Sequence, residues 1–334
     1  MTKKTAIPYA YKLLAGIVFF AGMFVVSIIL GAADIGIKDV WLAVTASSTN
    51  PNILIIQEIR LPREVGAALV GAAFGVAGAV MQGVTRNPLA DPGLFGLTSG
   101  AMAALAISLS INPNLNYFGI MIACFIGAAV GALLVIGLSS AKKGKLSPMR
   151  IVLAGAAIST FLIAISEGVS ILFKLSRNVS LWTAGGLIGT TWKQLAFVSP
   201  FIGVGILLAI VLSKQLTILS LSEEVAVGLG QKLQQTRALL FLSVILLTGA
   251  SVALVGNIAF VGLMIPHIVR VMTGTDYRFI VPMSAIVGAS FMLLADTAAR
   301  IIGAPYETPV VAIVAVLGLP FFLFVIHKGG KKIS

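Results

Sequence analysis

Long stretches without a charged residue divide this 334-residue chain, and they constrain its fold more than any other feature. Residues 13–33, 65–85, 194–213 and 308–327 contain no Asp, Glu, Lys or Arg. Each is long enough to cross a bilayer as a helix, which takes about 20 residues. Only 10% of the residues are charged and 58% are hydrophobic, which leaves too little charge for a water-facing surface. A soluble enzyme and a disordered chain are therefore excluded.

Longer uncharged runs predict further spans. Residues 92–141 hold 50 uncharged positions, enough for two helices with a turn at residues 112–114. Residues 238–269 form a second long run, which we expect to break at Gly256-Asn257. Two more runs contain one acid each: 151–173 with Glu167, and 279–299 with Asp296. Since barrel strands would be polar at every second position, we predict an all-α integral membrane protein with about ten transmembrane helices.

The positive charges lie mainly on one side of this topology. If the N-terminus is inside and the spans alternate, 16 of the 23 Lys and Arg residues face the cytoplasm. This bias follows the positive-inside rule and places both termini in the cytoplasm. The net charge of +12 is thus chiefly a topology signal, and we expect no nucleic-acid partner. The outer side holds Lys38, Arg60, Arg63, Lys174, Arg177, Lys193 and Arg300.

Rows of small residues predict close helix packing. Gly71 and Gly75 stand four apart in the second span, and Gly127 and Gly131 repeat that spacing in the fourth. Such rows let helix backbones approach closely in lipid. We favour packing within the chain over the alternative, a seam between two copies.

The longest cytoplasmic loop, residues 214–237, is predicted to carry a short amphipathic helix over 221–229. Ser220 and Glu223 match the S-x-x-E capping box, and Glu223 and Glu224 lie near the positive helix end. Gly230 would then provide a left-handed C-terminal cap. From these residues alone, the loop is equally a solvated connector or a docking element for a soluble partner.

The outer segment 174–193 is expected to form a short extracytoplasmic helix. It has 15 uncharged residues between Arg177 and Lys193, too few to cross the membrane. Trp182 and Trp192 are typical anchors at the membrane interface.

Two parts of the chain resemble the signature sequences of a known family. The first comprises Arg60-Leu61-Pro62-Arg63 with the glycine-rich residues 71–83 and then Asn87 to Gly93. The second comprises residues 255–270, continued by Asp296, Arg300 and Glu307-Thr308-Pro309. Together they resemble the permease subunits of ABC importers for iron–siderophore complexes, haem and cobalamin (the FecCD type). The resemblance extends over about residues 12–328.

This resemblance implies one permease domain over residues 1–334, with the fold of the cobalamin-importer permease. It implies four kinds of partner in a bacterial cytoplasmic membrane: a dimer of cytoplasmic ATPases, an extracytoplasmic substrate-binding lipoprotein, a second permease, identical or closely related, and the iron chelate. ATP and Mg²⁺ would bind the partner ATPase, because this chain has no phosphate-binding loop: Gly144-Lys145 is followed by Leu146. We therefore expect no cofactor on this chain and no enzymatic activity of its own.

The resemblance also suggests residue roles. Arg60, Arg63 and Arg300 would dock glutamates of the binding protein, since a guanidinium fork matches a carboxylate; snorkelling to the interface is the alternative. In loop 214–237, coupling to the ATPase would involve Ser220, Ser222, Glu223, Glu224, Gly228 and Gly230. Glu167 would line the translocation path or be a buried, hydrogen-bonded acid. Asp296 is expected to pair with Arg300, four residues on.

The predicted function is import of an iron(III)–siderophore complex as a non-enzymatic permease, with haem or cobalamin as alternatives. A proton-coupled carrier using Glu167 and Asp296 as relay acids represents a different class. With two histidines and one cysteine, a protein-built metal site is not expected.

Overall fold

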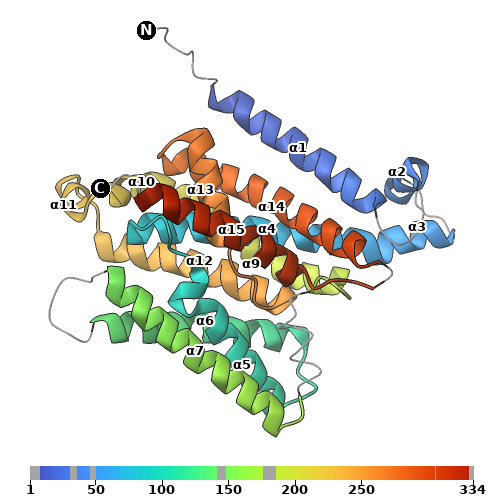
Figure 1. Cartoon of the computed structure of the whole chain (residues 1–334), viewed down its shortest axis with the longest axis horizontal. Helices are drawn as coiled ribbons and strands as arrows, with labels where there is room; N and C mark the ends of the chain where they lie inside the picture. The colour runs from blue at the N-terminus through green and yellow to red at the C-terminus, as the bar shows by residue number, and fades with distance from the viewer. Residues whose placement is uncertain are drawn as a thin grey trace.

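The computed structural model describes residues 8–30, 36–45, 50–140, 148–175, 186–304 and 306–330, and each regular element in these ranges is a helix (Figure 1). Seven helices are long and apolar enough to cross a membrane: α1 (Tyr9–Ile29), α4 (Leu61–Thr85), α6 (Tyr117–Ser140), α7 (Pro148–Leu172), α9 (Trp192–Val211), α12 (Leu233–Val255) and α14 (Tyr277–Ile302). Three more apolar helices are shorter: α5 (Leu97–Ile111), α13 (Val261–Thr273) and the apolar part of α15 (Val310–Gly330). Together they match the prediction of about ten helices.

Shorter helices lie at the two ends of the bundle. α2 (Ile37–Thr45), α3 (Pro51–Ile55) and the π-helix η1 (Ile56–Arg60) precede α4, and η1 continues into α4 without a break. At the other end are the 3₁₀ helix η2 (Pro92–Phe95), α10 (Ser213–Leu221) and α11 (Glu223–Gly228). The N-terminal end of α1 and the C-terminal end of α15 lie on the same side as α11 in Figure 1, as an even number of spans requires.

Both predicted interruptions are confirmed. α5 ends at Ile111 and α6 begins at Tyr117, with the Asn112–Asn114 turn between them. α12 ends at Val255, where Gly256 takes φ 76° and ψ −153°, a conformation that a side chain would strain. The chain then turns back as α13, whose 13 residues are too few to span a bilayer.

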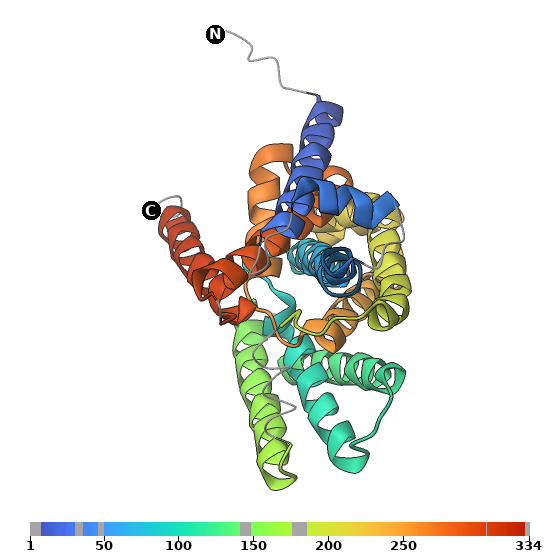
Figure 2. The ribbon, with the colours of Figure 1, turned by 90° about the vertical axis from the view of Figure 1, so that its right-hand side faces the viewer.

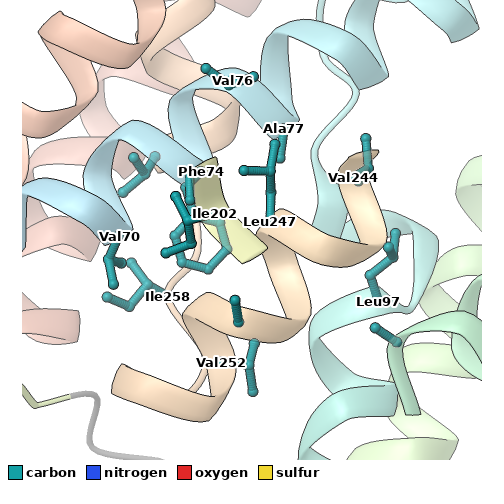
Figure 3. Close-up of a cluster of buried hydrophobic side chains, with 14 of the residues drawn as sticks. Val70, Phe74, Val76, Ala77, Leu97, Ile202, Val244, Leu247, Val252 and Ile258 are labelled. Carbon is teal, nitrogen blue, oxygen red and sulfur yellow. The ribbon is translucent and has the colours of Figure 1, made fainter. Parts of the chain in front are cut away.

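Helix α4 forms the centre of the molecule. Figure 2 shows it nearly end-on, with other helices around it. About 78% of the apolar segment that includes α4 is buried, against 11% for the peripheral α1. Val70 and Phe74 of α4 belong to a core that also includes Ile202 of α9 and Leu247 of α12 (Figure 3).

The small-residue rows pack within the chain, as predicted. A Cβ on Gly71 would lie 2.2 Å from the carbonyl oxygen of Gly288, and one on Gly78 would lie 1.8 Å from that of Gly262. α4 therefore touches α14 and α13 backbone to backbone. In the same way, the second row packs on α5. A Cβ on Gly127 would lie 2.2 Å from the carbonyl oxygen of Gly100, and a Cβ on Gly100 would lie 2.1 Å from that of Gly127. Without a hydrophobic effect between helices in lipid, this close contact holds the bundle together.

The outer segment 174–193 can be compared with the prediction only in part, since residues 176–185 lie outside the described ranges. Trp192 is not part of a separate short helix but the first residue of α9. Thr191 caps α9 in a full capping box with Gln194, and the Trp192 indole donates to the carbonyl of Gln57 at 2.8 Å.

Candidate functional sites at the two ends of the bundle

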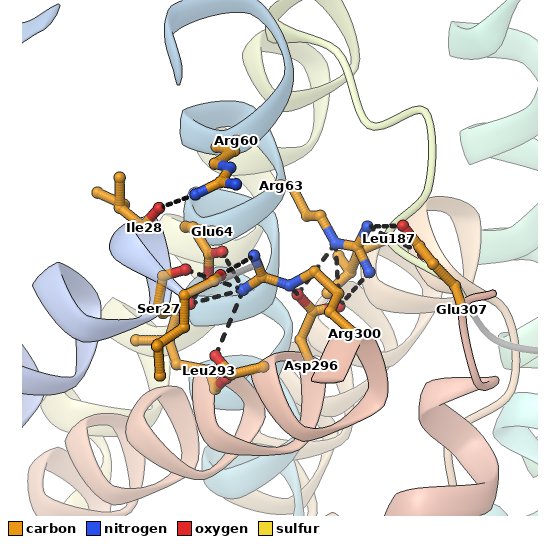
Figure 4. Close-up of polar contacts among 12 residues, drawn as sticks. Ser27, Ile28, Arg60, Arg63, Glu64, Leu187, Leu293, Asp296, Arg300 and Glu307 are labelled. Carbon is orange, nitrogen blue, oxygen red and sulfur yellow. Dashed lines mark hydrogen bonds and ion pairs between the residues drawn. The ribbon is translucent and has the colours of Figure 1, made fainter. Parts of the chain in front are cut away.

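At the outer end, a guanidinium from the first turn of α4 is held by two acids that are far away in sequence. Arg63 donates from Nε and Nη2 to the carboxylate of Asp296 at 2.9–3.1 Å. Its Nη1 donates to Glu307 at 2.9 and 3.0 Å (Figure 4). Asp296 is fully buried, whereas 37% of the Glu307 side chain is exposed. Arg63 thus links α4, α14 and the segment before α15.

A second guanidinium extends this cluster. Arg300 of α14 pairs with Glu64 at 2.5 Å and with Asp296 at 3.1 Å. The predicted pair at i,i+4 is therefore confirmed, although Asp296 also binds Arg63. Arg300 donates to the carbonyls of Ser27 and Leu30 at 3.1 and 2.9 Å, and the Ser27 hydroxyl donates to Glu64. The C-terminal end of α1 is thereby fixed to α4 and α14.

The third predicted arginine, Arg60, donates to the carbonyls of Ile28 and Ile29 at 2.5 and 3.1 Å. Arg60, Arg63 and Arg300 are only 6–8% exposed, so their charges point into the protein. We define the outer ion cluster as Arg60, Glu64, Arg63, Asp296, Arg300 and Glu307; three positive charges face three negative ones. Removing one partner from a buried pair typically costs about 3–5 kcal/mol, because the other charge is left uncompensated.

At the cytoplasmic end, the predicted helix is shorter than expected and begins later. α11 is capped by Ser222, whose hydroxyl accepts from the Val225 N–H at 3.1 Å. The prediction of Ser220 as the cap is wrong: Ser220 lies in the last turn of α10 and donates to the Thr217 carbonyl at 2.7 Å. The backbone is extended at Ser222 (φ −160°), so α10 ends before Glu223 and Glu224. Gly230 has φ 77°, as predicted.

α11 is tied to two long helices through one carboxylate. Glu223 accepts from Arg86 at 2.9 Å and from Arg237 at 2.6 Å. Arg86 ends α4 in a left-handed conformation with φ 53°, and Arg237 lies in the second turn of α12. Each of these side chains is between 31% and 41% exposed, so the ion pairs contribute little to the free energy of folding. They nevertheless connect α11 specifically to α4 and α12.

α10 is fixed in turn to the start of α14. Thr217 donates to Asp276 at 3.1 Å and accepts from the Tyr277 N–H at 2.9 Å. The Arg278 side chain, hydrogen-bonded to Asp276, holds the pKa of that carboxyl below its usual value. The sequence did not indicate this junction, since Thr217 has no distinctive pattern around it.

Residues of the two signature sequences meet in the interior. Gln82 of α4 donates to the Leu263 carbonyl at 3.1 Å and accepts from Arg270 at 2.8 Å. A Cβ on Gly262 would lie 2.9 Å from a carboxylate oxygen of Asp91. The other oxygen of Asp91 accepts from Gly93 N–H at 2.8 Å. We call these contacts the signature seam.

Glu167, predicted to line the path, lies on α7 with its side chain exposed. Exposed apolar residues, Phe161 and Ile171, occupy the same helix, whereas the neighbouring Ser166 is buried and donates to the Met102 carbonyl. Glu167 is therefore not a buried acid in the isolated chain, which was the alternative to the path-lining role. Within the described ranges, no three His, Cys, Asp or Glu residues are grouped so that they could hold a metal ion.

An all-helical bundle with about ten apolar helices defines an integral membrane protein. The sequence profile of the FecCD transport family matches residues 18–328. The chain therefore belongs to the FecCD transport family, and it is a multi-pass permease subunit of the ABC importer type.

Known relatives and a solved structure agree with this assignment. The chain is 42% identical to the iron(3+)-hydroxamate import system permease protein FhuB of Bacillus subtilis (strain 168), over 95% of this chain and 83% of that protein. It is 37% identical to the hemin transport system permease protein HmuU of Yersinia pestis, over 91% and 92% of the two chains. A solved inward-facing metal-chelate type ABC transporter matches with a TM-score of 0.82 and 26% identity, over 96% and 99% of the two chains.

Proposed function

We propose that this permease carries an iron(III)–siderophore complex into a bacterial cell, driven by ATP and Mg²⁺ on a dimer of partner ATPases. A second permease, identical or closely related, completes the path, and an extracytoplasmic binding lipoprotein delivers the chelate. The high identity to a hydroxamate permease supports a siderophore substrate. The iron remains wrapped in its chelator, so the permease binds the complex and needs no metal ligands.

The observation that carries this proposal is the surface of α11 at the cytoplasmic end. Val225, Val227 and Leu229 are 43–65% exposed there, and Leu221, the last residue of α10, is also exposed. Apolar side chains grouped on a water-facing element favour a protein partner. Ser222 and Glu224 shape the start of this element, and Gly228 and Gly230 shape its end, so that the apolar face meets the ATPase.

In this proposal, Glu223 transmits movement rather than contacting the ATPase. Its carboxylate joins α11 to α4 through Arg86 and to α12 through Arg237. When α11 tilts with the ATPase, these two ion pairs therefore move α4 and α12 together. Because exposed ion pairs contribute little to stability, the loss of Glu223 affects coupling more than folding.

The test is reconstitution of the permease with its ATPase and binding protein in proteoliposomes. Glu223→Gln is expected to lower siderophore uptake for each ATP hydrolysed, while assembly and ATP hydrolysis persist. Arg278→Gln is the matched control, since it also breaks a cytoplasmic ion pair, but one in which α11 takes no part. Normal uptake per ATP in Glu223→Gln would reject the transmission role.

We further propose that the binding protein docks at Arg60, Arg63 and Arg300. Each already has an internal partner, so a glutamate of the binding protein must replace one of them. Glu307 is the partner most open to exchange, because it is the most exposed acid of the outer ion cluster. Glu307→Gln should then tighten docking and Arg63→Gln should weaken it; equal affinity in both variants would overturn this exchange.

For Glu167 we keep the path-lining role as a proposal, supported by its exposed position on α7. Glu167→Gln should change the rate of uptake without changing ATPase assembly. An unchanged rate would leave the residue without a part in transport.

Haem import is the second candidate, favoured by the similarity to the hemin permease. Competition of labelled ferric hydroxamate uptake by excess haem or cobalamin separates the three substrates. Uptake without the ATPase that collapses with an uncoupler would instead support a proton-coupled carrier. The outer ion cluster argues against that class, since Asp296 is bound by two arginines as a structural ion pair.

A further inference from the structure

A cavity of about 560 Å³ lies between α1 and α14. Its lining includes no residue of the outer ion cluster and none of α11. Its lining is almost wholly apolar and includes Ala15 and Phe19 of α1 and Met283, Val287 and Ser290 of α14. α1 is the most peripheral span, and its other face presents exposed apolar side chains such as Leu14 and Val18. Phe19, which lines the cavity, is itself 58% exposed, so the cavity is open at the lipid-facing surface of α1.

The cavity lies within the depth of the inner leaflet. It begins at Lys12 and Met272, near the cytoplasmic ends of α1 and α13, and reaches Phe19 and Ser290. Seven residues of α1 separate Lys12 from Phe19, or about 10 Å of helix at 1.5 Å per residue. The inner half of the hydrocarbon core is about 15 Å thick, so an acyl chain can lie along the cavity.

A single cation marks the cytoplasmic rim. Among the lining residues, Lys12 is the charged one. Within the described residues its ammonium donates one hydrogen bond, to the Met272 carbonyl at 2.7 Å, and an ammonium has three donors. Tyr11 stands beside it, exposed and at interface level, as aromatic side chains prefer.

We propose that this cavity is a binding site for an anionic phospholipid of the inner leaflet. One acyl chain fills the space between α1 and α14, and the head-group phosphate meets the free donors of Lys12. Basic positions between helices on the cytoplasmic side bind anionic head groups by this chemistry. The lipid fills the gap beside α1, the least buried of the seven long spans in the described part of the chain.

Native mass spectrometry of the purified full-length permease tests this site. Dioleoyl phosphatidylglycerol and dioleoyl phosphatidylcholine, which share acyl chains, are titrated separately after delipidation. Wild type should retain the anionic lipid preferentially. Lys12→Gln should lower that preference about fivefold, since one lysine near an anionic surface contributes about that factor. Ala15→Phe, which fills the cavity, should lower the retention of both lipids.

Lys214→Gln is the matched control, because it removes one exposed cytoplasmic lysine elsewhere. Equal retention of the two lipids by wild type would overturn the proposal. An equal loss in Lys214→Gln and Lys12→Gln would also overturn it, since binding would then follow net charge. Retention unchanged in Ala15→Phe would place the lipid elsewhere on the surface.

Discussion

The outer ion cluster makes a strong prediction about stability. Asp296→Asn preserves the shape of the side chain but leaves three arginines with two carboxylates. Asp296 is fully buried and receives three hydrogen bonds from Arg63 as well as the charge of Arg300. The free energy of unfolding should therefore fall by about 3–5 kcal/mol, the usual loss for a broken buried pair.

The same substitution at the other end of α14 provides the control. Asp276 pairs with Arg278 at 2.6 Å, but 58% of the Arg278 side chain and 24% of the Asp276 side chain are exposed, and Asn caps a helix as well as Asp does. Asp276→Asn should thus change the free energy of unfolding by about 0–1 kcal/mol. Unfolding is followed by helical circular dichroism during titration with SDS in mixed micelles.

A double-mutant cycle separates pairing from general damage. Arg63→Gln combined with Asp296→Asn should cost less than the sum of the two single changes, because the uncompensated charge is gone. If Asp296→Asn proves no more damaging than Asp276→Asn, or if the two single effects simply add, the view of this cluster as a charge-balanced unit is refuted.

Three further expectations concern packing, capping and topology. Gly78→Val should prevent a folded, monodisperse permease in size-exclusion chromatography, because even one Cβ would overlap the Gly262 carbonyl; Gly22→Val, where the space is open, should be tolerated. Ser222→Ala should destabilise α11 by about 1 kcal/mol in hydrogen exchange, whereas Ser220→Ala should not, and the reverse order would restore Ser220 as the cap. Cysteines introduced at Gly228 and Tyr306 should react with impermeant reagents from the cytoplasmic and outer sides respectively, over a low background because native Cys124 is buried; labelling from the opposite sides would invert the topology.

The spans were predictable because charge is excluded from the bilayer core, so the gaps between charges locate the helices. The breaks at Gly256 and at Asn112–Asn114 were predictable because glycine and proline carry local conformational information. The family resemblance then located the candidate functional segments, residues 214–237 among them.

The sequence could not reveal which charged side chains form ion pairs across the fold. Arg63 and Asp296 are 233 positions apart, and no local pattern links them. Asp296 was assigned to Arg300 because an i,i+4 pair is visible in sequence; the second partner is visible only in three dimensions. The Ser220 cap failed for a related reason, since two serines both precede glutamates and only tertiary packing of α10 decides between them.

The signature seam limits how relatives of this permease can exchange parts. Gly78 and Gln82 come from the first half of the chain, and Gly262 and Arg270 from the second, yet they are in mutual contact. A chimaera joined in the middle of the chain would take its two halves from different permeases. These halves would then meet at the signature seam, where the backbones are too close to accommodate a larger side chain. Recombination between paralogues should therefore succeed only where both sides of that surface are inherited together or already agree.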